Sequence, residues 1–537
     1  MRNRTKTSYT ILWVSLALCL GIVMGNAVSK KKDMGGSSAQ RNSLYKLSSA
    51  LKTMEDEYVD EIDYDSIVDR MLGTTLQSLD PHSRYLSVEE LSKEDEYLHG
   101  QFDGVGVILY YIDDTACVEQ VFENGPSNGK LQTGDRIVTI DGETVAGVGL
   151  TNTEVVGKIR GPKRSKVDLG VKRYGEEGLH HVVLTRNVIN TYSISYSGMV
   201  DDHTGYVRLT KFIESSYREF YDAVSRLKRK GMTDLVLDLR SNGGGLLDQA
   251  INICDELLPG NELIVYTEGA HQSRQDVHSR PGGLFAKGNL VVLIDENSAS
   301  ASEIVSGAIQ DNDRGIIVGR RSFGKGLVQR QFMLPDKSAM YLTVARYYTP
   351  SGRCIQRPYD KGTDEYYNDY LKQVMFDFTQ DSMLTCVTDS TPYRTTKGRI
   401  VYGGGGIYPD YPLPYHTDLD IVYYNKLLEK GLTTRWAFDY VTREWGNLKK
   451  RYPKSEDFVK KYTVSEAMWQ EFLRYAESKG VRRDARSLAK YGGMIRLRLK
   501  AELANCLYST DTFYEIMLPE DEDISRALEI KKKHLNK

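Results

Sequence analysis

The strongest constraint on the fold is an alternation of strand-like apolar runs with helical segments between residues 204 and 319. The strand-like runs are 204–210, 233–240, 289–298 and 315–319, and the helical segments are 216–231, 246–257 and 301–312. Strands that alternate with helices in this way form a sheet covered by helices. The sequence therefore predicts an α/β domain, to which we assign residues 189–415.

A second, β-rich domain is predicted over residues 98–188. The stretch LQTGDRIVTIDGETV at 131–145 closely resembles the hallmark of PDZ domains. The loop FDGVGV at 102–107 matches the position where such domains bind a chain terminus, through Gly104, Val105, Gly106 and Val107. Successive backbone amides can hold a carboxylate there, and the adjoining strand edge accepts the peptide as an added strand.

The remaining segments are predicted from length and pattern. The chain has 537 residues, more than the roughly 250–300 that one hydrophobic core usually serves. Residues 29–42 are small and polar and are interpreted as a linker. Apolar residues at helical spacing predict a small helical region over 43–97, and residues 416–537 are charged and predicted to form a C-terminal helical domain.

The first 28 residues differ from the rest of the chain. A basic start is followed by an almost uncharged apolar run from Ile11 to Met24 and then by three lysines. This pattern is typical of an export signal, although the run is only slightly shorter than a membrane span. Both a cleaved signal and a retained anchor fit, and we favour an anchor at 9–28. Either one places the body of the protein in the periplasm or cell envelope, in agreement with the positive-inside tendency.

Composition restricts the partners. Hydrophobic residues make up 40% of the chain and charged residues 27%, which is typical of soluble globular domains. The formal net charge of −2 gives no reason to propose a nucleic acid partner. The six cysteines are scattered without a C-x-x-C pair, so no zinc site is indicated. A homo-oligomer is left open.

The stretch ENSASASEI at 296–304 allows two interpretations of the role of Ser300. Ser300 and Glu303 fit the S-x-x-E capping box, in which a hydroxyl and a carboxylate satisfy free amides at a helix start. Ser300 also lies at a strand-to-helix junction, and strand ends at one edge of a parallel sheet cluster in space. On the capping pattern alone a structural role is favoured, so the choice depends on what else reaches this serine.

Two further segments of the α/β region supply what a serine nucleophile needs. Lys325 in SFGKGLVQ is a candidate base, provided that burial lowers its pKa from about 10.4 toward 7, at a cost of roughly 4 kcal/mol. Gln329 lies four residues on, and on a strand that spacing places both side chains on one face, where Gln329 could orient the amine. Backbone amides of the loop Gly243, Gly244 and Gly245, with that of Ala301, are candidates to hold the oxyanion.

Five motifs in order resemble carboxy-terminal processing proteases, also called tail-specific proteases: SLDPHSRYL, the PDZ stretch, DLRSNGGGLL, NSASASEI and FGKGLVQ. The resemblance runs from about residue 43 to 412. It implies a crotonase-like α/β core, with Ser300 as nucleophile, Lys325 as base and Gln329 in support. It also implies that the PDZ domain presents substrate C-termini. A PDZ arginine implicated in activation of some members falls on Arg160.

Other readings fit the sequence less well. The stretch GRRSFGK at 319–325 matches the start of a phosphate-binding loop, but such a loop needs Ser or Thr next and a helix after it, whereas Gly326 and a β-like run follow. No G-x-S-x-G elbow is present for a Ser-His-Asp enzyme. A scaffold that binds C-termini without cutting is the alternative from another class, and intact Ser300 and Lys325 argue against it.

The sequence thus predicts an exported serine endopeptidase with a Ser-Lys dyad. We expect it to cut envelope proteins near their carboxy-terminal ends, at loosely defined apolar or small-residue sites. No metal or nucleotide cofactor is expected.

Overall fold

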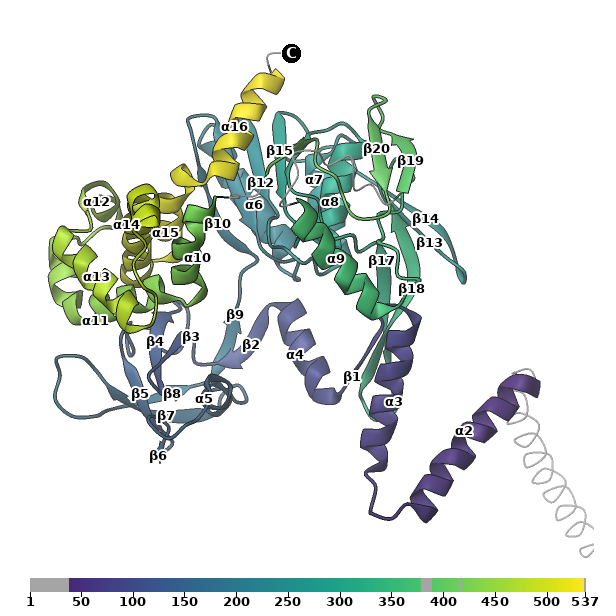
Figure 1. Ribbon diagram of the computed structural model, residues 1–537, viewed down its shortest axis with the longest axis horizontal. Coiled ribbons are helices and arrows are strands. Elements are labelled where there is room, and N and C mark those ends of the chain that lie inside the picture. Colours follow the sequence, from purple (N-terminus) through teal and green to yellow (C-terminus); the bar gives the residue numbers. More distant parts are fainter. Residues whose placement is uncertain (1–37, 378–388, 415–417, 536–537) are drawn as a thin grey trace, which may run out of the picture. The chain divides into compact units, whose positions relative to one another are not determined.

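The computed structural model describes residues 38–377, 389–414 and 418–535 (Figure 1). The predicted signal or anchor at 1–28 lies outside these residues. The chain divides into two compact units, residues 1–74 and 75–537. The described part of the first unit contains α2 (Ser38–Glu57) and the beginning of α3 (Tyr64–Leu79). Within the described ranges, no helix has both the length and the apolar character that crossing a membrane requires.

The second unit is built on a six-stranded sheet in the order β10-β11-β12-β15-β16-β21. All neighbouring strands are parallel except β10, which is antiparallel to β11. The strands are β10 (Ile194–Met199), β11 (Thr204–Leu209), β12 (Asp234–Asp238), β15 (Asn289–Ile294), β16 (Ile316–Gly319) and β21 (Tyr411–Pro412). The helices between them are α6 (Ser216–Arg229), α7 (Leu247–Leu257) and α8 (Ala301–Asp311). The predicted α/β alternation is confirmed.

Both faces of this sheet are buried, which explains why its strands are continuously apolar. Alternate residues such as Leu235 and Leu237 of β12 pack with α6, α7 and α8 in the main core. The intervening Val236 faces the other side and packs in a cluster with Ile524 and Ala527 of α16 (Glu522–Leu535). The last helix of the chain therefore covers one face of the central sheet (Figure 1).

A second, antiparallel sheet adjoins the first. Its order is β1-β18-β13-β14, with β17 also paired to β18. The strands are β1 (Arg84–Leu86), β13 (Leu263–Gly269), β14 (Gln272–His278), β17 (Leu327–Met333) and β18 (Ala339–Tyr348). α9 (Thr363–Asp377) follows, then the pair β19 (Asp389–Arg394) and β20 (Ile400–Gly403). β1 lies inside the region 43–97 that was predicted to be helical, and it leads into α4 (Val88–His99).

The PDZ domain has its own five-stranded path, β3-β4-β5-β7-β8, around a separate core. Its strands are β2 (Gln101–Gly104), β3 (Val107–Ile112), β4 (Thr115–Val121), β5 (Arg136–Ile140), β6 (Glu143–Thr144), β7 (Lys166–Lys172), β8 (His180–Thr185) and β9 (Asn187–Asn190), and its helix is α5 (Asn152–Ile159). β3 pairs only with β4 in the part of the chain that the structure describes. Among these residues no strand pairs with the other edge of β3.

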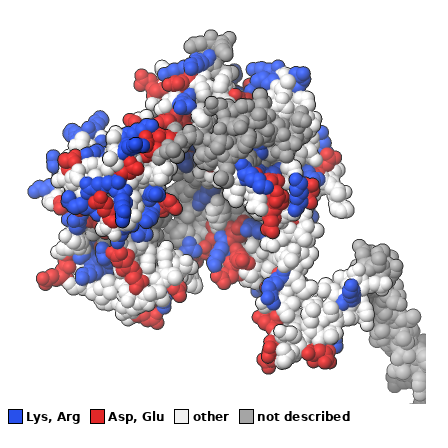
Figure 2. All heavy atoms as spheres, in the orientation of Figure 1, with Lys and Arg blue, Asp and Glu red and all other residues white. Residues whose placement is uncertain are grey.

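Helices dominate the C-terminal region, as predicted. They are η2 (Leu419–Ile421), α10 (Val422–Glu429), α11 (Leu432–Arg451), α12 (Ser455–Lys461), α13 (Glu466–Ser478), α14 (Ala485–Leu507), α15 (Thr510–Met517) and η3 (Leu518–Glu520), followed by α16. Their core includes Ile112 and Cys117 of the PDZ domain. On the face that Figure 2 shows, Lys and Arg side chains are prominent over this helical region, with Asp and Glu side chains among them.

Candidate active site

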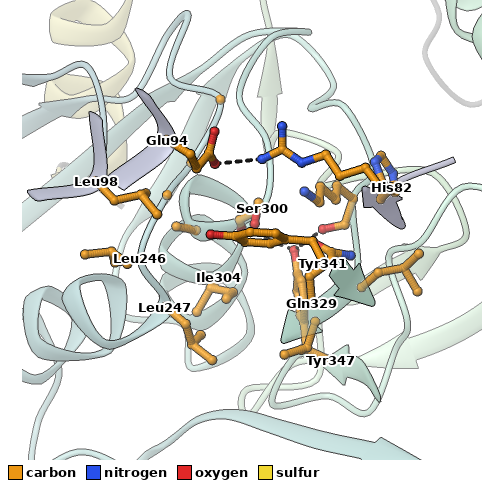
Figure 3. A pocket seen from close by; sticks show the side chains of 18 of the residues that line it. His82, Glu94, Leu98, Leu246, Leu247, Ser300, Ile304, Gln329, Tyr341 and Tyr347 are labelled. Atoms are coloured by element: carbon orange, nitrogen blue, oxygen red, sulfur yellow. Dashed lines mark hydrogen bonds and ion pairs between the residues drawn. The ribbon is translucent and has the colours of Figure 1, made fainter. Parts of the chain in front are cut away.

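A pocket of about 580 Å³ contains every residue that was predicted to take part in catalysis: Ser300, Lys325, Gln329, Ala301 and the loop 243–245. Its walls come from the turn before β1 and from α4, the start of α7, the start of α8, β17 and β18. Figure 3 shows Ser300 with the apolar side chains of Leu246, Leu247 and Ile304 to one side. The segments are far apart in sequence, so the fold assembles this site. Their catalytic roles stay predictions.

Ser300 occupies a sharp junction between β15 and α8. Its φ of 54° and ψ of −111° lie in a region that side chains rarely adopt, which is typical of strained residues at functional sites. The turn is held by Ser298, whose hydroxyl donates to the carbonyl of Leu239 at 2.8 Å. The amide of Ala299 donates to the carbonyl of Asn242 at 3.0 Å. The serine backbone is therefore fixed against the glycine loop.

Glu303 links the nucleophile to the segment that carries the lysine. Its fully buried carboxylate accepts hydrogen bonds from the amides of Ser300 (2.8 Å), Gly324 (2.7 Å) and Lys325 (2.9 Å) and from the hydroxyl of Ser322 (2.6 Å). Burial raises its pKa to about 7, against the effect of these donors. The reach-back bond of the predicted capping box is thus present, and the same carboxylate also orders residues 322–325.

Lys325 lies in the pocket just before β17. Burial is the main cause that lowers the pKa of its amine, and the positive charge of Arg84 acts in the same direction. The carboxylates of Glu303 and Asp80 oppose this shift. The hydroxyl of Tyr347 donates to the carbonyls of Lys325 (2.7 Å) and Ser300 (3.2 Å), so one buried side chain ties both backbones together.

Gln329 lines the pocket, but not for the reason that the sequence suggested. The premise that Lys325 and Gln329 share a strand is wrong, because β17 begins at Leu327 and a register shift follows Val328. Both residues nevertheless line the same cavity, and Gln329 is labelled there in Figure 3. The Gln329 amide donates to the hydroxyl of Thr343 at 3.2 Å, which fixes its orientation.

The glycine loop packs directly on the serine. Gly244 has a φ of +100°, and a Cβ there would lie 2.8 Å from Cβ of Ser300. Its amide donates to the side chain of Asn242 at 2.9 Å. Gly245 has a φ of +140°, and a Cβ would lie 2.0 Å from the carbonyl oxygen of Phe212. Positions 244 and 245 therefore require glycine, and the amide of Gly244 is already engaged.

Sequence reasoning did not identify three charged or titratable residues of this pocket: His82, Arg84 and Glu94. His82 accepts or donates a hydrogen bond with the hydroxyl of Tyr366 at 3.1 Å. Burial, followed by the charge of Lys325, lowers the pKa of His82 to about 4. The motif SLDPHSRYL was the available signal, but nothing in its spacing placed it beside Ser300.

The predicted ligand loop of the PDZ domain joins β2 to β3. Gly106 has a φ of +78°, and a Cβ there would lie 2.8 Å from the backbone of Gly125, so the loop is tightly packed. The carbonyl of the buried Val105 accepts from the amide and hydroxyl of Ser127. Gly104 ends β2 and Val107 begins β3, which places the loop at the start of an edge strand of the sheet.

Arg160 lies outside the Ser300 pocket. It follows α5, and its guanidinium pairs with Glu96 of α4 at 2.8 Å and covers the ring of Phe102 at 4.2 Å. The other face of α4 contributes Glu94, Tyr97 and Leu98 to the pocket. In the described ranges, no cluster of three or more His, Cys, Asp or Glu is arranged to hold a metal.

The comparisons with known proteins agree with this architecture. The family model of peptidase family S41 matches residues 203–365, a PDZ-domain model matches 72–172, and a model of a family of unknown function matches 423–509. The chain is 36% identical over 308 residues to a carboxy-terminal-processing protease of Bartonella bacilliformis, covering 56% of this chain and 69% of the relative.

Two further relatives are similar over comparable lengths. A carboxyl-terminal-processing protease of Synechocystis is 34% identical over 298 residues, covering 54% of this chain and 68% of the relative. The carboxy-terminal processing protease CtpA of Bacillus subtilis is 29% identical over 362 residues, covering 66% of this chain and 76% of the relative.

Proposed function

This chain belongs to peptidase family S41 and is a carboxy-terminal-processing serine protease, and from that premise we propose that Ser300 and Lys325 form its catalytic dyad. The observation that carries the proposal is the pocket itself. It brings a strained serine at a helix start together with a half-buried lysine whose pKa is lowered. A lysine can accept a proton only when it is neutral, and burial favours that form.

The proposed reaction has two half-reactions. The neutral amine of Lys325 takes the proton from the Ser300 hydroxyl while the serine oxygen attacks the carbonyl carbon of the scissile bond. The resulting ammonium gives this proton to the leaving amine as the C–N bond breaks, which leaves an ester on Ser300. Lys325 then deprotonates a water molecule that attacks the ester, and the proton returns to the serine oxygen as the acid product leaves.

We assign the negative oxygen of each tetrahedral intermediate to backbone amides at the loop and the helix start. The amide of Gly244 is engaged by Asn242, which leaves those of Gly243 or Gly245, together with Ala301, as the donors. Ala301 is the first residue of α8, so the positive end of the helix adds to this stabilisation. Gln329 is proposed to orient the Lys325 amine from its position on β17.

The apolar walls of the pocket support a substrate preference. Leu246, Leu247 and Ile304 lie beside Ser300 (Figure 3). Side chains that are small or apolar would bury against them without leaving a polar group unpaired. We therefore propose cleavage after small or apolar residues near the C-termini of envelope proteins.

The PDZ domain is proposed to present these C-termini. The edge of β3 away from β4 supports addition of an extended peptide strand, and the amides of the loop 104–107 would receive the terminal carboxylate. Residues 9–28 are proposed to hold the enzyme at the membrane, with the catalytic unit in the cell envelope.

The direct test is cleavage of an unfolded test protein by the purified chain. Ser300→Ala is expected to abolish cleavage while binding of a C-terminal peptide, followed by fluorescence anisotropy, is retained. Cleavage that persists in Ser300→Ala would remove this serine from its role. Wild-type protein that binds the peptide but never cuts would support the non-cleaving scaffold instead.

A further inference from the structure

Two opposite charges lie on the rim of the Ser300 pocket and outside the proposed dyad. The guanidinium of Arg84 pairs with the carboxylate of Glu94 at 2.7 Å, and both residues line the cavity that holds Lys325. The dashed line in Figure 3 marks this contact, between Glu94 and the guanidinium. The side chain of Arg84 is 46% exposed and that of Glu94 is 27% exposed, so the pair is partly solvated.

The fold holds each charge in place by independent contacts. Arg84 begins β1, and its backbone pairs with Tyr341 of β18, while its guanidinium lies 5.2 Å from the centre of the Tyr341 ring. Glu94 lies on α4, whose start is fixed by the capping box of Ser87 and Glu90. The two charges therefore stay near Lys325 through different elements.

The charged groups that act on Lys325 oppose one another. Those that face it or influence its amine are Asp80 and His82 in the turn before β1, Arg84 in β1, Glu94 in α4 and Glu303 in α8. Arg84 is the cation among them, because His82 is neutral near pH 7. After burial, its charge is the next largest cause of the lowered pKa of Lys325.

We propose that Arg84 and Glu94 are positioning residues for the proton transfer: from the wall of the pocket that holds Lys325, the charge of Arg84 disfavours the protonated amine, and Glu94 anchors the guanidinium and opposes its effect. This inference rests on the proposed role of Lys325 as the base. It assigns to the segment 80–94 a part in tuning the base rather than in contacting the substrate.

The test is a matched pair of charge-removing substitutions that break the same ion pair. Arg84→Gln removes a positive charge, so the Lys325 amine holds its proton more tightly. The acidic limb of the kcat/KM profile then moves to higher pH, by about 0.5 to 1 pH unit for a partly solvated charge. Glu94→Gln removes a negative charge, so the limb moves to lower pH. Both shifts are expected to shrink at high salt.

The opposite signs separate tuning from a structural role. Loss of the ion pair is common to both variants, so a merely structural role predicts changes in the same direction or in rate alone. Arg84→Lys keeps the charge and is expected to keep the limb near its wild-type position. Glu89→Gln removes an exposed carboxylate of α4 outside the pocket, and is expected to leave the limb unchanged.

The outcomes distinguish this inference from the proposed function. In one outcome, the acidic limbs of Arg84→Gln and Glu94→Gln shift in the same direction or not at all, while Ser300→Ala and Lys325→Ala are inactive. That result would overturn the tuning role and leave the dyad intact. Activity that survives in Lys325→Ala would overturn the dyad and this inference with it. If Arg84→Gln does not fold, Glu94→Gln alone decides, because any shift other than one to lower pH contradicts the proposal.

Discussion

Two helices of this protein begin with the same S-x-x-E pattern, and their environments give the pattern different chemistry. At α4, Ser87 has extended backbone angles, and its hydroxyl accepts from the amide of Glu90 at 3.3 Å. At α8, Ser300 has a positive φ, and the amide of Glu303 donates to its backbone carbonyl at 2.9 Å. The first is an exposed cap, whereas the second lies in a pocket with Lys325 and the glycine loop.

The two glutamates differ in the same way. Hydrogen bonds from Ser87 lower the pKa of the exposed Glu90, whereas burial raises that of Glu303 to about 7. Glu90 satisfies one helix start, while Glu303 also orders the segment that carries Lys325. A local sequence pattern can therefore indicate where a helix begins. Whether its serine can act as a nucleophile depends on the residues that the fold brings beside it.

The largest expected effect concerns Lys325, the proposed base. It lines the pocket at the start of α8 and has no counterpart at the start of α4. Lys325→Arg is expected to be as inactive as Lys325→Ala, with a loss of about 10²–10⁴-fold in kcat, because a guanidinium does not give up its proton. The matched control is Lys93→Arg on α4, an exposed lysine paired with Glu89. Steady-state cleavage assays check this. Substantial activity in Lys325→Arg would contradict the role of Lys325 as the base, and with it the chemical difference between the two helix starts.

A second prediction compares the two glutamates directly. In Glu303→Gln the new NH₂ group must face at least one N–H donor, from Gly324 on one side or from Ser300 and Lys325 on the other. The buried mismatch is expected to cost about 1–3 kcal/mol of unfolding free energy. The displaced dyad should lose about 10- to 100-fold in activity.

The matched change at the exposed cap should be mild. Glu90→Gln is expected to cost no more than about 0.5 kcal/mol and to leave cleavage close to wild type. Urea unfolding and cleavage assays on both variants provide the comparison. Equal losses in the two variants would show that Glu303 is only a capping residue.

A third prediction concerns the pH dependence of stability, which should have opposite signs at the two caps. The folded-state pKa of Glu303 is raised from 4.5 to about 7, so the folded protein binds more protons than the unfolded chain in this window. Its contribution to stability therefore falls as pH rises from about 4.5 to 7, by at most about 3 kcal/mol. The folded pKa of Glu90 is lowered, so its contribution is present at neutral pH and is lost on acidification.

The variants isolate these two contributions. Unfolding free energies measured between pH 4 and 8 should show a stability gap between wild type and Glu303→Gln that becomes smaller as pH rises. The gap for Glu90→Gln should instead become smaller as pH falls. A gap for Glu303→Gln that widens with pH would mean that the Glu303 carboxyl of the wild-type protein is charged throughout this range and that burial does not raise its pKa.

Much of the architecture follows from local pattern. The apolar strands and amphipathic helices between residues 204 and 319 appear where predicted, because strands buried on both faces have a strong signal. The PDZ motif and the loop at 102–107 are continuous in sequence and were recognised directly. Ser300, Lys325 and the glycine loop were placed together because strand ends meet at one sheet edge, and the pocket does contain all of them.

What the sequence did not reveal depends on contacts between distant segments. β1 has three residues, too few to show a period, and it is a strand because β18 pairs with it. His82, Arg84 and Glu94 reach the pocket from before the PDZ domain. The covering of the central sheet by α16 likewise depends on long-range packing, including the buried pair of Lys531 with Asp234 at 2.7 Å.

The central claim is that the fold keeps the Lys325 amine neutral enough to accept a proton from Ser300. The most direct test is an NMR titration of protein carrying ¹³C at the lysine ε-carbons, with the Lys325 signal assigned by its absence in Lys325→Arg. The account predicts that this signal titrates at a pH clearly below that of the exposed lysines of the same protein. Titration together with the exposed lysines, in enzyme that is active in the same buffer, would contradict it.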